Sequence, residues 1–462
     1  MSKYLDRPRR GCVISQHPVG RTLLYWSLAA LAAVAVAACT DGSSGSAPLD
    51  PGGLDPIADA PNEANGRVEI TNDQAALDAR VVYSAMDVPI DGDRSAVGPP
   101  GTRTVKPDGS IVMTKASSSV TLTLIAEIAP PALAGQTVQA TSVSRILGNV
   151  AVVGYNMRGA PYLGGVDWIA RVDTSRPLLS SGAIFNDADV NAVAADGLRV
   201  YMAIATSAPQ YPYPAAIERL SILGNRMRLA DNDRAGLVSY AATSVVEVGN
   251  TVYATSGDAG GVYALAGSNF ALLGTFPLHD ARWVAWDEQG DRIVVVQGTP
   301  GQISVFAEGD FPGGSMNLLN TFPFPGADVP ESKSTVEIAG GKAFIAAGPE
   351  GVQIVCLDTG ALIGNVPRPD PASLGLDPSV VVANAVTVDR DLMFISNGEA
   401  GVYVGRATQR FSDSGCAPQS IGVEGKLRFA NLQSANHVSF RGEYLFVAAG
   451  LGGVKVVRVR DN

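Results

Sequence analysis

Residues that bind metals or form disulfides are scarce in this chain of 462 residues. It has only three histidines and four cysteines, too few for a Cys/His metal array or a disulfide-dense scaffold. His279 and His437 lie far apart, and neither has a second His or Cys at ligand spacing. The G-x-S-x-G elbow of many hydrolases and the G-K-[ST] phosphate loop are also absent. We therefore expect no metal, no cofactor and no specific catalytic residue.

Charge is low as well, and acidic residues outnumber basic ones. Charged residues make up 17% of the chain, whose formal charge is −10, against the ~25% charged residues of an average globular domain. Without residues 1–38, which hold five basic side chains and one acidic one, the formal charge becomes −14. Such a surface repels a phosphate backbone, so nucleic acid is not an expected partner.

The N-terminus has the organisation of an export signal. Basic residues precede Leu23–Ala38, a mostly apolar stretch of 16 residues that is shorter than the ~20 needed to span a bilayer. Small residues then lead directly to Cys39, as before a signal-peptide cleavage site. The segment resembles the lipobox of bacterial lipoproteins, which implies that residues 1–38 are removed and that Cys39 is lipidated. Two alternatives are an ordinary signal with an incidental cysteine and a twin-arginine signal at Arg9-Arg10.

Residues after the anchor are poor in apolar side chains. Residues 39–66 comprise Cys39 and a stretch rich in Gly, Ser, Pro, Ala and Asp, which predicts a flexible tether.

Residues 67–118 contain two strand-like runs, the second turning on Pro107-Asp108-Gly109. Because about fifty residues rarely form an independent core, we expect a small β extension there.

The remainder of the chain, residues 119–462, repeats itself. Seven copies share an apolar run, a turn and a second run that alternates apolar and polar residues, the pattern of a β-hairpin. The turn slots are 50, 52, 41, 50, 50 and 52 residues apart and hold Tyr155, Ala205, Gly257, Gly298, Gly348, Gly398 and Gly450. This period predicts an all-β fold, a seven-bladed β-propeller with four strands per blade.

The last repeat lacks an outer strand, since the chain ends two residues after Arg460. The strand-like run Val120–Ile128 precedes the first repeat. We expect it to complete the seventh blade, because a propeller closed by both ends of the chain leaves no open sheet edge.

A short motif precedes most hairpins and suits the innermost strand of a blade. It consists of a small residue, a polar residue, any residue and an aliphatic residue. Its second position is polar in all seven repeats: Thr141, Asn191, Thr243, Arg282, Ser334, Asn384 and Asn436. One hypothesis is that these side chains rim the central channel, with Arg282 as a candidate for binding an anion. The alternative is that they bond the backbone of neighbouring loops, as Thr, Ser and Asn often do.

The repeat resembles that of the LVIVD-repeat propellers, which combine a polar inner strand, a glycine turn and an LRIVD-type third strand. Gly351–Asp358 and Ile169–Asp173 carry the resemblance most closely, with an acidic residue at the motif's last position. The resemblance implies a propeller that is secreted or lipid-anchored, and it implies no particular chemistry.

Two features suggested sites outside the channel. The hairpin loops at Tyr155–Gly165 and Thr206–Ala216 are long and lie in adjacent repeats. They offer a candidate binding surface that contains Tyr155, Arg158, Tyr162, Tyr211 and Tyr213. The alternative is that these tyrosines only cover the flank of a blade. Cys356 and Cys416 would sit in an oxidising compartment, where they could form a disulfide or remain two separate thiols.

The sequence thus favours a binding module over an enzyme. We expect a lipid-anchored propeller of the bacterial cell envelope, at the outer membrane, that binds a protein or a glycan. Two alternatives are an enzyme of the lactonase or lyase kind working at the channel and a structural lipoprotein that assists outer-membrane assembly.

Overall fold

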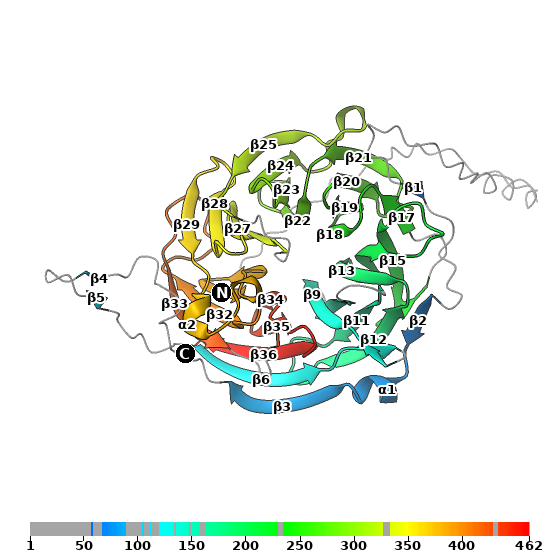
Figure 1. The fold of residues 1–462 in the computed structure, drawn as a ribbon, viewed down its shortest axis with the longest axis horizontal. Helices are drawn as coiled ribbons and strands as arrows, with labels where there is room; N and C mark the ends of the chain where they lie inside the picture. Colours follow the sequence, from blue (N-terminus) through cyan, green and yellow to red (C-terminus); the bar gives the residue numbers. More distant parts are fainter. Residues whose placement is uncertain are drawn as a thin grey trace, which may run out of the picture. The chain divides into compact units, whose positions relative to one another are not determined.

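The computed structural model describes residues 57–58, 67–88, 104–105, 111–112, 120–133, 135–146, 149–157, 162–229, 234–326, 333–427 and 433–461. The predicted signal, Cys39 and Arg158 lie outside these residues. Within them, the chain folds into seven antiparallel sheets of four or more strands, which are the predicted blades (Figure 1). No described helix has the length and apolar content of a membrane span.

Blades 1 to 3 are built from consecutive strands. Blade 1 is β9 (Gln139–Ile146), β10 (Val150–Asn156), β11 (Gly164–Ala170) and β12 (Leu178–Phe185). Blade 2 is β13 (Ala188–Ala195), β14 (Arg199–Thr206), β15 (Ala215–Leu223) and β17 (Arg234–Leu237), with β16 (Arg226–Arg228) paired to β15. Blade 3 is β18 (Ala242–Val248), β19 (Thr251–Ser256), β20 (Gly261–Ala266) and β21 (Leu272–Pro277).

Blades 4 to 6 follow the same plan. Blade 4 is β22 (Ala281–Asp287), β23 (Arg292–Gln297), β24 (Gln302–Ala307) and β25 (Leu318–Pro323). Blade 5 is β26 (Val336–Ala339), β27 (Lys342–Ala346), β28 (Val352–Cys356) and β29 (Leu362–Val366). Blade 6 is β30 (Ala385–Asp389), β31 (Leu392–Ser396), β32 (Val402–Ala407) and β33 (Ile421–Leu427). Short helices in the connections are η1 (Pro312–Gly314), α2 (Pro371–Leu374) and η2 (Pro378–Val380).

Blade 7 combines both ends of the propeller. It contains β34 (His437–Arg441), β35 (Tyr444–Ala448), β36 (Val454–Asp461) and, as its fourth strand, β6 (Val120–Ile128). β6 pairs with β36 over its whole length, so the predicted closing strand is confirmed. Each inner strand contacts the inner strand of the next blade, and β34 contacts β9 to complete the ring.

Segments before the propeller add further strands to the outside of its blades. β1 (Ile57–Ala58) pairs with β17, and β2 (Val68–Thr71) pairs with β12. After α1 (Gln74–Asp78), β3 (Val81–Val88) pairs with β6. The belt that we define as residues 67–88 therefore runs along the outer edges of blades 1 and 7, where the ring closes (Figure 1). Two separate short hairpins are β4 (Thr104–Val105) with β5 (Ile111–Val112) and β7 (Ala132–Leu133) with β8 (Gln136–Thr137).

Apolar side chains between neighbouring blades form the core. The cluster between blades 1 and 7 includes Ile125, Val153 and Phe446, and α1 of the belt contributes the fully buried Leu77 to it. The other six clusters likewise lie between or within neighbouring sheets. The alternating apolar residues of each strand thus face the next blade, which is what the period-2 pattern predicts.

Candidate functional site

One face of the ring carries the starts of all seven inner strands. Because the four strands of a blade run antiparallel, the turn between its second and third strands lies at this same face, as does the connection from each outer strand to the next inner strand. The predicted loops that follow β10 and β14 emerge here, in adjacent blades. We call this end of the channel the mouth.

Five side chains of the polar ring predicted from the sequence each bond the next blade around the ring. The hydroxyl of Thr243 in blade 3 donates to the Ala281 carbonyl oxygen of blade 4 at 2.7 Å. Thr141 reaches Val190 of blade 2 at 3.0 Å, Asn191 reaches Ala242 of blade 3 at 3.0 Å, and Asn436 reaches Ala140 of blade 1 at 2.9 Å, each through a backbone carbonyl oxygen. Arg282 instead donates to the Ser334 hydroxyl at 3.3 Å. Four of these five bonds go to backbone carbonyl oxygens of the next blade, as the alternative interpretation expects.

Asn191, Thr243 and Arg282 also line a cavity of about 520 Å³ at the mouth. The other residues that line it come from blades 1 to 5: Asn156, Tyr240, Ala241, Asp258, His279, Asp280, Trp283, Thr299 and Lys333. Thr141, Ser334 and Asn384, by contrast, are buried, and Asn436 is only partly exposed and does not line this cavity. Three of the seven side chains therefore face the cavity, three are buried, and Asn436 does neither.

Two basic side chains of the cavity have carboxylate partners. The Arg282 guanidinium lies 2.8 Å from the Asp280 carboxylate. The Nδ1 atom of His279 lies 3.2 Å from the Asp258 carboxylate and 2.8 Å from the Asp258 carbonyl oxygen. Arg282, the sequence-based candidate for binding an anion, is therefore already paired within its own chain.

Lys333 is one of several cavity residues that the sequence did not single out. It precedes β26 in blade 5, and its Nζ atom donates to the Thr141 carbonyl oxygen of blade 1 at 2.6 Å. Burial lowers the pKa of its amine to about 7, because desolvation disfavours the charged form. A signal was present: the first position of the inner-strand motif is Ala or Val in the other six repeats and Lys only here.

Lys333 lies near two aromatic rings from blades 4 and 7. Trp283 stacks on His437 with ring centroids 5.3 Å apart. Burial, and then the positive charge of Lys333, lower the pKa of His437 to about 3, so this imidazole is neutral at physiological pH. Its Nδ1 atom has no hydrogen-bond partner among the residues that the structure describes.

The predicted tyrosine surface on the two long loops needs correction at Tyr155. Its side chain is fully buried, and its hydroxyl donates to the Asp167 carboxylate at 2.6 Å. Tyr155 belongs to β10 rather than to the loop, so it cannot contact a partner. Tyr162 and Tyr213 are only partly buried and keep surface area at the mouth face.

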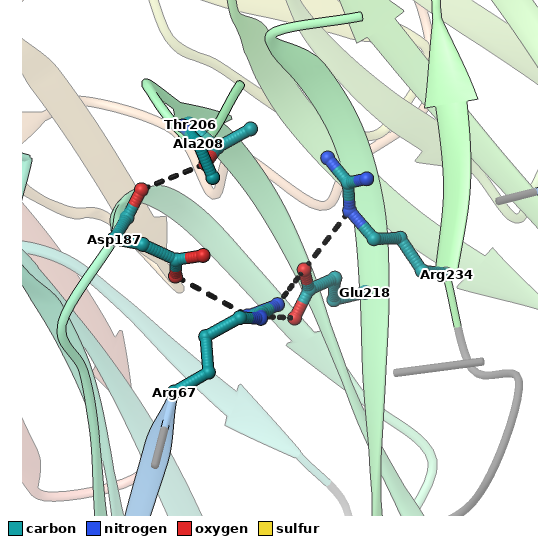
Figure 2. Close-up of polar contacts among 6 residues, drawn as sticks. All are labelled: Arg67, Asp187, Thr206, Ala208, Glu218 and Arg234. Carbon is teal, nitrogen blue, oxygen red and sulfur yellow. Dashed lines mark hydrogen bonds and ion pairs between the residues drawn. The ribbon is translucent and has the colours of Figure 1, made fainter. Parts of the chain in front are cut away.

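Tyr211 covers a buried cluster of charges in blade 2. Its ring centroid lies 3.5 Å from the Arg234 guanidinium and 5.6 Å from that of Arg67. Both arginines pair with the fully buried Glu218, and Arg67 also pairs with Asp187 at 3.4 Å (Figure 2). The start of the loop is fixed as well, since the Thr206 hydroxyl donates to the Asp187 carbonyl oxygen at 2.7 Å and accepts from the backbone N–H of Ala208 (Figure 2).

The two cysteines of the propeller are joined. The structure holds a disulfide between Cys356, at the end of β28, and Cys416, which follows β32, with their Cα atoms 5.4 Å apart. The bond links blade 5 to the connection between the last two strands of blade 6. Among the described residues, no group of three or more His, Cys, Asp or Glu side chains could hold a metal ion.

Comparisons with known proteins add little to this description. No protein-family description and no curated protein match the sequence. Similar solved structures include the computationally designed Ika8 protein, at 14% identity and a TM-score of 0.43, which covers 82% of this chain and 100% of its own. The WD40 repeats of RRP9 match at 12% identity and a TM-score of 0.48, over 72% of this chain and all of theirs. A chain of the mitotic checkpoint complex matches at 11% identity and a TM-score of 0.46, over 70% of this chain and 90% of its own. The strand pairing described above, rather than these matches, establishes the seven-bladed propeller.

Proposed function

We propose that this chain is a lipid-anchored binding module of the bacterial cell envelope, at the outer membrane, and that its ligand enters the cavity at the mouth of the propeller. The supporting observation is the cavity itself. Its volume of about 520 Å³ lies in the range of ~300–1,000 Å³ typical of small-molecule sites. The proposed anchor at Cys39 and the tether that follows would hold the propeller away from the membrane.

A glycan suits the side chains of this cavity better than a protein segment. Tyr240, which is 62% exposed, and Trp283 offer aromatic faces, against which the C–H groups of a sugar ring can pack. The carboxylates of Asp258 and Asp280 accept hydrogen bonds, and the amides of Asn156 and Asn191 both donate and accept. Sugar hydroxyls need such a mixture of partners around an aromatic face.

The decisive experiment is glycan-array screening of the full-length protein in detergent, followed by titration of the best binder. Tyr240→Ala should weaken that binding about fivefold or more, the loss expected for one aromatic contact. Leu451→Ala is the matched control, because Leu451 is 63% exposed and lies at the same face, in the β35–β36 turn. Equal effects of the two variants, or no glycan bound at all, would contradict a glycan site.

One observation favours an enzyme as the second candidate. Asp258, His279, Asp280 and Lys333 are titratable and line the same cavity, and such clusters are common at catalytic sites. Mass spectrometry of the bound glycan after prolonged incubation distinguishes the two. The mass of the glycan stays unchanged if the protein only binds it, whereas a lyase or a lactonase converts it to a product of different mass.

A further inference from the structure

Lys333 differs from the other basic groups of the cavity in its partners. Arg282 and His279 each lie next to an aspartate carboxylate. Within the described part of the chain, the partner of the Lys333 amine is the carbonyl oxygen of Thr141. An ammonium group has three N–H donors, so this contact leaves two of them to be satisfied.

This arrangement favours an anion from outside the chain. Taking an ammonium group out of water is costly unless a counter-charge compensates it. Lys333 lines the cavity, so a ligand that enters the mouth can supply that charge.

The charges around the cavity restrict which anion fits. Asp258 and Asp280 both line it, and two carboxylates repel a multiply charged group such as phosphate. A single carboxylate on a molecule that is otherwise neutral and rich in hydroxyls suffers less repulsion, and its hydroxyls can donate to these aspartates. A uronic acid residue has this chemistry.

We propose that the cavity binds acidic glycans and that the carboxylate of a uronic acid residue pairs with the ammonium group of Lys333. This inference rests on the proposed glycan-binding function and adds the class of sugar to it. It also assigns the anion contact to Lys333 in place of Arg282, whose guanidinium is held by Asp280 at 2.8 Å.

Binding should be coupled to uptake of a proton. In the free protein the pKa of Lys333 is about 7, and a bound carboxylate raises it by favouring the charged amine. Affinity is then greatest and constant below pH 7. Above pH 7 it falls, by up to about tenfold per pH unit, until the pKa of the complex is reached.

The experiment compares two probes by calorimetric titration into the full-length protein in detergent, at pH 6. The probes are methyl β-D-glucuronide and methyl β-D-glucoside, which differ only at the carboxylate. The wild type should bind the glucuronide about tenfold or more tightly than the glucoside, as expected for a charged hydrogen bond. Lys333→Met should abolish this preference. Lys342→Met should keep it, because Lys342 is a buried lysine outside this cavity that donates to Gly340 and Asp413.

Each outcome decides a separate point. Equal affinity of the wild type for both probes would overturn the acidic-glycan inference and leave the proposed function standing, whereas binding of neither probe would count against the glycan site itself. Tighter binding of inorganic phosphate than of the glucuronide would overturn the choice of a carboxylate. If Lys333→Met does not fold, the glucuronide is titrated into the wild type at pH 8 in two buffers of different ionisation enthalpy, which measures the protons taken up on binding. Proton uptake is expected, and its absence would refute the pairing of the carboxylate with Lys333.

Discussion

The amine of Lys333 in blade 5 donates to the carbonyl oxygen of Thr141 in blade 1, with 2.6 Å between nitrogen and oxygen. These residues are 192 positions apart in the sequence, and blades 6 and 7 separate them around the ring in one direction. The bond therefore crosses the channel. It places a basic group where seven inner strands converge.

The first prediction concerns the pH dependence of folding. Burial lowers the pKa of Lys333 from 10.5 to about 7 in the folded state. Between these two values the unfolded state binds more protons, so this group makes the free energy of unfolding rise with pH. Lys333→Met removes that contribution. The stability of the variant relative to the wild type should therefore decrease steadily from pH 7 to pH 9.5 in urea denaturation, and a difference independent of pH would contradict it.

The second prediction tests the polar ring between blades. The Thr243 hydroxyl bonds the Ala281 carbonyl oxygen at 2.7 Å and the Thr255 hydroxyl at 2.9 Å. Thr243→Val keeps the shape of the side chain and removes both bonds, which should lower the free energy of unfolding by about 1–2 kcal/mol. Thr408→Val at an exposed position serves as the control in the same urea denaturation. Equal effects of the two variants would mean that the ring contributes nothing to stability.

The third prediction concerns how the belt is attached to the propeller. Asp167 in β11 is fully buried, and it pairs with Arg80 at 3.0 Å and with the Tyr155 hydroxyl at 2.6 Å. Arg80→Ala leaves a buried carboxylate without its counter-charge and should destabilise the protein by about 3–5 kcal/mol. Arg228→Ala, at an exposed residue, should stay within about 0.5 kcal/mol of the wild type. A similarly small effect of Arg80→Ala in urea denaturation would show that the belt attaches by other contacts.

The fold was predictable because its signals are local. Alternation of apolar residues and the turn slots, most of them glycine, identified the hairpins, and the absence of an outer strand in the last repeat pointed to Val120–Ile128. The pairing of β6 with β36 follows this prediction. The strands of a blade are neighbours in the sequence, so patterns of about fifteen residues were sufficient.

The candidate site was harder to predict because it depends on contacts between blades. Tyr155 looked like a loop residue, and only the fold shows that Asp167 on the next strand and Arg80 of the belt enclose it. Lys333 occupies a motif position that holds Ala or Val in the other six repeats. Which residue lies across the channel from it depends on the geometry of the ring. No periodicity in the sequence carries that information.

The fourth prediction tests the anchor, which lies outside the described residues. The basic residues, the apolar stretch Leu23–Ala38 and the small residues before Cys39 predict a lipidated cysteine at the mature N-terminus. Cys39→Ser should move the protein from the membrane fraction to the soluble fraction after cell lysis. Mass spectrometry of the N-terminal peptide should show loss of the lipid. Membrane retention with an unchanged N-terminal mass would argue against lipidation.

The fifth prediction concerns closure of the ring, and two truncations separate its parts. A chain that begins at residue 119 loses the belt but keeps β6, whose side chains of Leu122 and Ile128 are buried against neighbouring strands. A chain that begins at residue 132 also loses β6, which bares the edge of β36 from Val454 to Asp461. An exposed strand edge promotes pairing between molecules.

The shorter chain should therefore aggregate or melt well below the longer one, because it loses the burial of β6 and is left with three strands in blade 7. The longer chain bares β6 where β3 paired with it but keeps four strands in blade 7, as in blades 3 to 6. It should therefore stay monomeric in size-exclusion chromatography and lose only the stability that the belt contributes. If both truncations had the melting temperature of the wild type, neither the belt nor β6 would be needed to hold the ring together. If both truncations melted equally far below the wild type, the stability would depend on the belt and not on the pairing of β6 with β36.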